Sequence, residues 1–200
     1  MSDEIRKKVE ESFADSILVK KNIIDQNLYQ VLLQAGDIIS QSIVEGGKLL
    51  ICGNGGSAAD AQHLTAELLI RLRPTVNRKP IPAICLQMDS STITGCSNDF
   101  SFNEVFSRPL TALGRKGDVL IAISTSGKSK NILKVLKKAK EMKIFSICFL
   151  GNNGGNAKKL CDLPIIVKSN ITARIQEAHI FLGHYILEQV ETNLLENKKL

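Results

Sequence analysis

The segment from Lys48 to Arg71, KLLICGNGGSAADAQHLTAELLIR, brings together the residue types of an active site. An apolar run ends at the glycine-rich turn 53–56, and a helical pattern capped by Ser57 begins there. We therefore expect free backbone N–H groups that can bind an anion. His63 and Glu67 follow at i, i+4 spacing, which places both on the same face of that helix. An imidazole and a carboxylate beside an anion-binding turn predict a site for acid–base chemistry.

A second polar loop, residues 124–129, follows the apolar run DVLIAI and begins another helical pattern. It contains four hydroxyl groups, those of Ser124, Thr125, Ser126 and Ser129. Hydroxyl and backbone N–H donors at a helix N-terminus bind a phosphate dianion without a buried cation. An ordinary Ser/Thr-rich turn that caps a helix is the alternative. Four hydroxyls within six residues favour the phosphate site, and the glycine turn then lets a substrate approach the backbone.

Two nucleotide-binding motifs fit this chain poorly. Gly127-Lys128-Ser129 resembles the end of a P-loop, but Ala122 stands where the first glycine of that motif belongs. The turn 53–58 matches the loose glycine fingerprint of dinucleotide-binding sites, yet no acidic residue ends the next strand. The nearest candidate, Asp89, comes late in the sequence. Dinucleotide binding is therefore the weaker interpretation.

The segment RIQEAHIFLGH, residues 174–184, contains Gln176, His179 and His184. A single histidine on a helix is more often packed or solvated than bound to a ligand. Gln176 and His184, however, lie near an apolar helix face, where polar groups are costly unless they have partners. Partnering through a metal ion or a substrate is the sharper interpretation.

Strand-like and helical patterns alternate along the chain. Because the apolar runs are nearly continuous, they suit a parallel sheet that is buried on both faces. We expect an α/β fold, a three-layer α/β/α sandwich with five parallel strands and two N-terminal helices, and ligands at the carboxyl ends of the strands. After the run before Gly53, strands are expected at Ile81–Leu86, Asp118–Ile123, Ile144–Leu150 and Leu163–Val167, and helices at Phe102–Leu113, Ile132–Lys140 and Thr172–Leu195.

Composition indicates one domain, residues 1–200, because 200 residues with 44% hydrophobic content can bury one substantial core. Within it we expect helices for oligomer contacts in 1–46 and the α/β core in 47–200. The net charge of +6 is dispersed, without interleaved aromatic residues, so it favours collecting a phosphorylated metabolite over binding nucleic acid. No apolar run approaches ~18 residues, and the five cysteines form no CxxC pair. We therefore expect a cytoplasmic protein with buried reduced thiols and no membrane partner.

Four ordered segments carry a resemblance that covers nearly the whole chain: CGNGGSAADAQHLTAEL, SNDFSFNEVFSR, ISTSGKSKN and RIQEAHIFLGH. Together they resemble the phosphoheptose isomerase family of the sugar isomerase (SIS) domain superfamily, which has a flavodoxin-like fold. The resemblance implies a zinc ion, one per subunit, held by His63, Glu67, Gln176 and His184. It also implies substrate contacts from Asn54, Gly55, Gly56, Glu67, Asn98, Asp99, Ser124, Thr125, Ser126, Ser129 and Gln176.

The activity that the resemblance implies converts sedoheptulose 7-phosphate, a seven-carbon ketose, to D-glycero-D-manno-heptose 7-phosphate through an enediolate. Glu67 and His184 match the catalytic pair, with Glu67 as the carbon base and zinc polarising the carbonyl. Gln176 and His184 are ~12 Å apart along a straight helix, so either long side chains bridge that span or neighbouring subunits contribute. The family implies a homotetramer that makes heptose for surface glycans such as lipopolysaccharide or capsule.

Two alternatives stay open at this point. One is a non-catalytic SIS-domain binding protein, either a replication-initiator partner or a sugar-phosphate sensor, although such a module has no need of the four matched metal-site residues. The other is an isomerase of a shorter or aminated sugar phosphate. The chain also departs from the family pattern at Leu69-Ile70 and in a longer connection at 77–79, next to the site. These departures could alter sugar preference or subunit packing.

Overall fold

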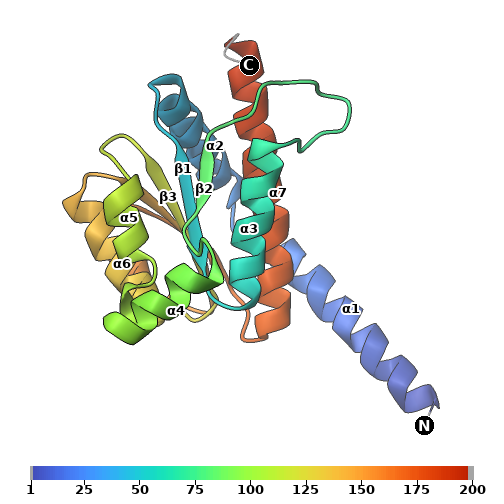
Figure 1. The fold of residues 1–200 in the computed structure, drawn as a ribbon. Helices are drawn as coiled ribbons and strands as arrows, with labels where there is room; N and C mark the ends of the chain where they lie inside the picture. Colours follow the sequence, from blue (N-terminus) through green and yellow to red (C-terminus); the bar gives the residue numbers. More distant parts are fainter. Residues whose placement is uncertain (1, 198–200) are drawn as a thin grey trace.

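The computed structural model describes residues 2–197 of the chain. A five-stranded parallel sheet of order β2-β1-β3-β4-β5 lies at its centre, between two layers of helices (Figure 1). The strands are β1 (Leu49–Gly53), β2 (Ala83–Cys85), β3 (Val119–Ser124), β4 (Phe145–Gly151) and β5 (Leu163–Val167). The helices are α1 (Ser2–Asp25), α2 (Tyr29–Val44), α3 (Gly56–Leu69), α4 (Ser90–Asp99), α5 (Ser107–Leu113), α6 (Lys130–Glu141) and α7 (Thr172–Glu196). The expected α/β fold is confirmed.

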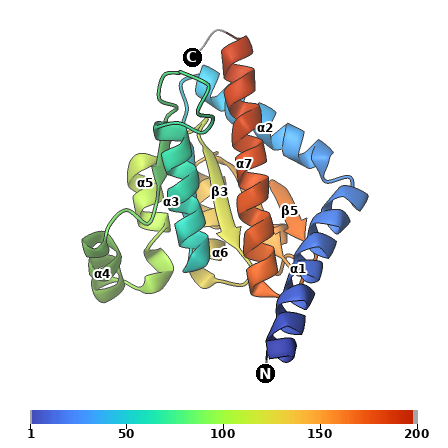
Figure 2. The same cartoon turned by 90° about the vertical axis from the view of Figure 1, so that its right-hand side faces the viewer.

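The apolar side chains of the strands fill two cores, one on each face of the sheet. Successive side chains of a strand point to opposite faces, so Leu49 and Ile51 pack in one cluster while Leu50 and Cys52 pack in the other. Helices α2, α3 and α7 cover the first face, and α5 and α6 cover the second (Figures 1 and 2). Burial on both faces explains why the strands appear in the sequence as continuous apolar runs.

The helix expected at Phe102–Leu113 is wrong in its extent. A short 3₁₀ turn occupies Phe102–Glu104, and α5 begins only at Ser107. Pro109 explains the break, because a proline inside a helix leaves a carbonyl without its donor, whereas in the first turn no donor is needed. Starting at Ser107 places Pro109 in that first turn.

Helix α4 was not expected from the sequence. Its cap is Asp89, whose carboxylate accepts hydrogen bonds from the backbone N–H and the hydroxyl of Thr92, each at 2.8 Å. These bonds favour the charged form and lower the pKa of Asp89. Asp89 therefore acts as a helix cap, a role that agrees with setting aside dinucleotide binding.

Helix α1 extends away from the body of the molecule, as Figures 1 and 2 both show. Near its C-terminal end Val19 and Ile23 join the core. Apolar side chains nearer the N-terminus of the helix are solvent-exposed, among them Phe13 at 67% and Ile17 at 66%. No helix among residues 2–197 has the length and apolar character needed to cross a membrane.

Candidate active site

The glycine turn after β1 has the conformation that only glycine adopts easily. Gly55 caps α3 with a φ of 57°, in the left-handed region. A Cβ atom on Gly53 would clash with the carbonyl oxygen of Ser57. The helix begins at Gly56 without a side-chain cap, so the expectation that Ser57 caps it is wrong. Glycine at the cap needs no side-chain oxygen, and Ser57 is instead buried within the first turn.

A reciprocal pair of amides ties the glycine turn to the hydroxyl loop. The Nδ2 of Asn54 donates to Oδ1 of Asn131 at 2.9 Å, and the Nδ2 of Asn131 donates back at 2.8 Å. Asn131 lies in the first turn of α6 and is buried. The side chain of Asn54 therefore fixes the distance between the two loops. Sequence analysis did not single out Asn131, although its place directly after the hydroxyl loop is the signal that could have found it.

The hydroxyl loop curls around Gly127, which has a φ of 61°. The Oγ of Ser124 accepts a hydrogen bond from the N–H of Gly127 at 3.1 Å, and the Oγ of Ser126 accepts from that of Lys128 at 3.2 Å. Each hydroxyl keeps its own hydrogen as a donor. Ser129 stands at the start of α6 without a side-chain cap bond, so the helix N-terminus and the hydroxyls share one loop.

A polar cavity of about 210 Å³ opens beside this loop. The expected residues Thr125 and Ser126 line it. Its other lining residues were not expected from the sequence: Lys128, Asn152, Asn153, Ser169, Asn170, Thr172 and Ile175. Asn152 and Asn153 belong to the turn that follows β4. The carboxyl ends of parallel strands meet at one edge of the sheet, which brings these separate segments together.

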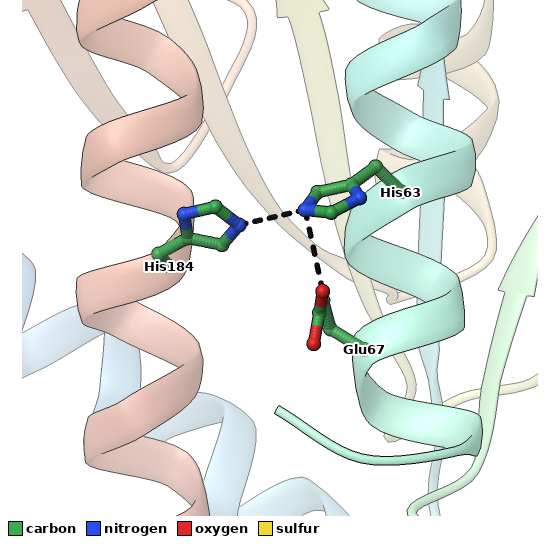
Figure 3. Close-up of side chains that lie close together, drawn as sticks. All are labelled: His63, Glu67 and His184. Carbon is green, nitrogen blue, oxygen red and sulfur yellow. Dashed lines mark hydrogen bonds and ion pairs between the residues drawn. The ribbon is translucent and has the colours of Figure 1, made fainter. Parts of the chain in front are cut away.

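Three of the expected chemical side chains meet between α3 and α7 (Figure 3). The Nε2 atoms of His63 and His184 are 2.8 Å apart, and Oε1 of Glu67 lies 3.3 Å from the same Nε2 of His63. One ligand atom from each residue lies within 4.8 Å of the other two. Two imidazoles and a carboxylate form a donor set that suits Zn²⁺ and leaves coordination positions for a substrate.

The His63, Glu67 and His184 side chains are open to solvent on one side, since that of His63 is 48% exposed and that of Glu67 is 20% exposed. When neither imidazole is charged, only one of the facing Nε2 atoms donates and the other accepts. The cluster can therefore pass protons as well as hold a cation. Gly183 allows this meeting, because a Cβ atom there would lie 2.7 Å from Leu64 of α3.

Gln176 lies at a different level of the two helices. Its side-chain amide sits against Gly56, the first residue of α3, where a Cβ atom would clash with the Nε2 of Gln176. Gly56 precedes His63 by seven residues, or about 10 Å along the helix axis. Among the four expected metal ligands, the structure brings three together and places Gln176 at the glycine turn. A metal contact from Gln176 stays a prediction.

Asn98 and Asp99 form the exposed end of α4, where the Nδ2 of Asn98 donates to Oδ1 of Asp99 at 2.9 Å. Asp99 lines a cavity of about 460 Å³ that shares no lining residue with the hydroxyl-loop cavity. The expected contact of Asn98 and Asp99 with sugar hydroxyls also stays a prediction.

His179, the third histidine of the chain, is a core residue. Burial lowers its pKa to about 4, so its imidazole is neutral near pH 7. Its Nε2 lies 3.1 Å from the carbonyl oxygen of Leu150, which can only accept, so Nε2 carries the proton.

Asp60 on α3 lies near His63. Burial raises the pKa of the Asp60 carboxyl, and the nearby imidazole of His63 opposes part of that rise.

Comparison with known proteins places the chain among sugar-phosphate enzymes. The SIS domain family matches residues 12–151. The phosphoheptose isomerase of Clostridium acetobutylicum is 45% identical over 191 residues, which cover 95% of this chain and 96% of that relative. The phosphoheptose isomerase of Paramagnetospirillum magneticum is 53% identical over 163 residues, covering 82% of each chain. The phosphoheptose isomerase structure from Neisseria gonorrhoeae superposes with a TM-score of 0.87 at 38% identity, over 94% of this chain and 99% of that one.

We predict that Asn131→Ala destabilises the protein, because it leaves the part-buried amide of Asn54 without its partner. The cost of such an unmatched amide is about 1–3 kcal/mol of unfolding free energy, measurable by urea unfolding. The matched control is Asn156→Ala, since Asn156 is exposed. In a double-mutant cycle, Asn54→Ala and Asn131→Ala should be strongly non-additive. Additive effects would show that the pair does not hold the loops together.

Proposed function

This chain belongs to the phosphoheptose isomerase family of SIS-domain proteins, and on that basis we propose that His63, Glu67 and His184 form its catalytic centre. The reaction of the family is the isomerisation of sedoheptulose 7-phosphate. The observation that carries the assignment is the convergence of these three side chains from two helices. A non-catalytic SIS-domain module would not require that convergence, and the relatives that match most of the chain are isomerases.

The ketose-to-aldose step moves two protons. We assign Glu67 to remove the proton from C1 of the ketose and to return it to C2 of the enediolate, because its carboxylate is 20% exposed and can reach a substrate. His184 then exchanges the proton between the C1 and C2 oxygens, giving it to the C2 oxygen as the C1 hydroxyl loses its own. His63 contacts both Glu67 and His184, and we assign it to hold these two side chains in place relative to each other.

The donor set of His63, Glu67 and His184 fits Zn²⁺, and we propose one ion per subunit. When bound, such an ion supplies positive charge that stabilises the oxyanion of an enediolate. Gln176 is the proposed fourth ligand. It lies against Gly56 at the start of α3, so it would reach the ion only by extending along α7 or by serving another subunit.

The phosphate end of the substrate is proposed to bind the hydroxyl loop at Ser124, Thr125, Ser126 and Ser129. Supporting this, the loop combines hydroxyl donors with the N-terminus of α6, and Thr125 and Ser126 line a polar cavity. The remaining proposed contacts are Asn54, Gly55, Gly56, Gln176, Asn98 and Asp99. Because both amide atoms of Asn54 are paired with Asn131, we propose that Asn54 acts mainly by shaping the turn.

A homotetramer is the proposed assembly, with residues 1–46 supplying contacts. The support is the apolar face of α1, where Ile5, Val9, Phe13 and Ile17 are all at least half exposed. Monomeric proteins rarely leave so continuous an apolar surface open to water. Phe181 and Tyr185 on α7 flank His184 in the sequence and are also exposed, so a neighbouring subunit could border the site. The heptose product is proposed to feed surface glycans.

Glu67→Gln and His184→Gln should each lower kcat by about 10²–10⁴-fold, the usual contribution of one acid–base group. A coupled assay of sedoheptulose 7-phosphate isomerisation measures this. Phosphate-end binding should survive in both variants, because the hydroxyl loop is intact. Glu177→Gln is a suitable control, because Glu177 lies on α7, the helix of His184, but pairs with Arg174. Turnover near the wild-type rate in either test variant would remove the assignment.

Removing metal with a chelator should abolish turnover, and adding back Zn²⁺ should restore it, if the three-residue cluster holds a catalytic ion. Elemental analysis of the dialysed protein should give one zinc per subunit. His63→Ala should lose this zinc while keeping its helical circular dichroism. Full activity in the metal-free protein would overturn the zinc proposal and leave the acid–base assignment standing.

Replacing Phe13 with glutamate should dissociate the tetramer, since it puts a charge into the apolar face of α1. Light scattering after size-exclusion chromatography measures the mass. Glu11→Gln, on the same helix in the exposed polar part, should leave the tetramer intact. A monomeric wild-type protein, or an unchanged tetramer in Phe13→Glu, would contradict the proposed role of residues 1–46.

A further inference from the structure

The connection between α3 and β2 carries a buried arginine, Arg78, whose side chain is only 1% exposed. We propose that Arg78, held by Glu191, is a positioning residue that sets the place of Glu67 opposite His184. This inference rests on the proposed function of Glu67 and extends it to a residue that touches neither substrate nor metal.

The guanidinium of Arg78 binds the last turn of α3. One nitrogen donates to the backbone carbonyl of Glu67 at 2.8 Å, and another donates to that of Leu68 at 2.9 Å. The last four carbonyls of a helix lack partners within it, and a cation there also opposes the negative end of the helix dipole. Arg78 therefore caps α3 at the residue that carries the catalytic carboxylate.

The same guanidinium reaches across to α7. Its Nε donates to Oε1 of Glu191 at 2.5 Å, and the other oxygen of Glu191 pairs with Arg73. Glu191 is fully buried and follows His184 by seven residues, two turns along the same side of α7. Figure 1 shows this connection passing beside the C-terminal half of α7. Arg78 thus joins the helix that bears Glu67 to the helix that bears His184.

A buried ion pair is a poor device for stability alone, because well-packed apolar residues of similar volume often stabilise a protein as much or more. What this ion pair contributes instead is the orientation of the groups that it joins. A planar guanidinium donates along fixed lines, and here those lines end on two carbonyls of one helix and a carboxylate of another. A catalytic group displaced by about 1 Å can lose about 10²-fold in rate.

The test compares Arg78→Gln and Arg78→Lys with Arg73→Gln. Arg73 shares Glu191 but has no hydrogen bond to α3 among the described residues, so it is the matched control. We expect Arg78→Gln to lower kcat by about 10–10²-fold with KM changed less than about twofold. Arg78→Lys should stay impaired because an ammonium lacks the planar fork. Arg73→Gln should keep kcat near that of the wild type.

Zinc affinity supplies a readout that does not depend on turnover. Chelator competition followed by elemental analysis should show about 10–10²-fold weaker zinc binding in Arg78→Gln, as for other groups that orient a metal ligand, and little change in Arg73→Gln. Circular dichroism and thermal unfolding identify the folded fraction, to which kcat is normalised. If Arg78→Gln does not fold, the comparison of Arg78→Lys with Arg73→Gln decides the matter.

Equal kcat losses in the Arg73 and Arg78 variants, or wild-type kcat and zinc affinity in the Arg78 variants, would overturn the positioning role. Failure of the proposed function has a different signature, which is wild-type turnover in Glu67→Gln. An inactive Glu67→Gln together with fully active Arg78 variants would refute only the present inference.

Discussion

The close approach of α3 to α7 is the contact on which the rest of the site depends. Both helices pack on the same face of the sheet, and they run in parallel, since Gln176 meets Gly56 and Gly183 meets Leu64 one level further on. A glycine at 183 permits this approach where any side chain would collide with Leu64. One residue later, His184 faces His63. Small changes in the packing of these two helices would therefore move the side chains proposed to be catalytic.

The sheet explains the other half of the site. Because all five strands are parallel, their carboxyl ends place the glycine turn, the hydroxyl loop and the turn after β4 at one edge. The Asn54–Asn131 pair fixes two of these loops to each other. The result is a polar edge at the start of α3 and α6, with the His63, Glu67 and His184 cluster about two helical turns further along α3. Such a separation suits an extended substrate with a phosphate at one end.

The sequence predicted much of the fold because strong local patterns decided it. Five apolar runs, two amphipathic helices before the first strand and a long final helix are all present. The errors arose where one residue changed the local outcome. Pro109 divided an expected helix, Asp89 capped a helix without a strong apolar pattern, and Gly55 rather than Ser57 capped α3. Caps and breaks depend on single backbone groups, so periodicity says little about them.

By itself the sequence determined the class of fold, the family and the side chains able to do chemistry, because these depend on residue types and spacing. Only the tertiary structure decided which of them meet. His184 lies 121 residues from His63 yet 2.8 Å away, whereas Gln176, on the same helix as His184, sits at another level against Gly56. The sequence also could not predict the partners of Arg78, because residue spacing within one helix says nothing about how two helices are aligned with each other. That alignment is set by side-chain packing across the interface, where Gly183 fits against Leu64.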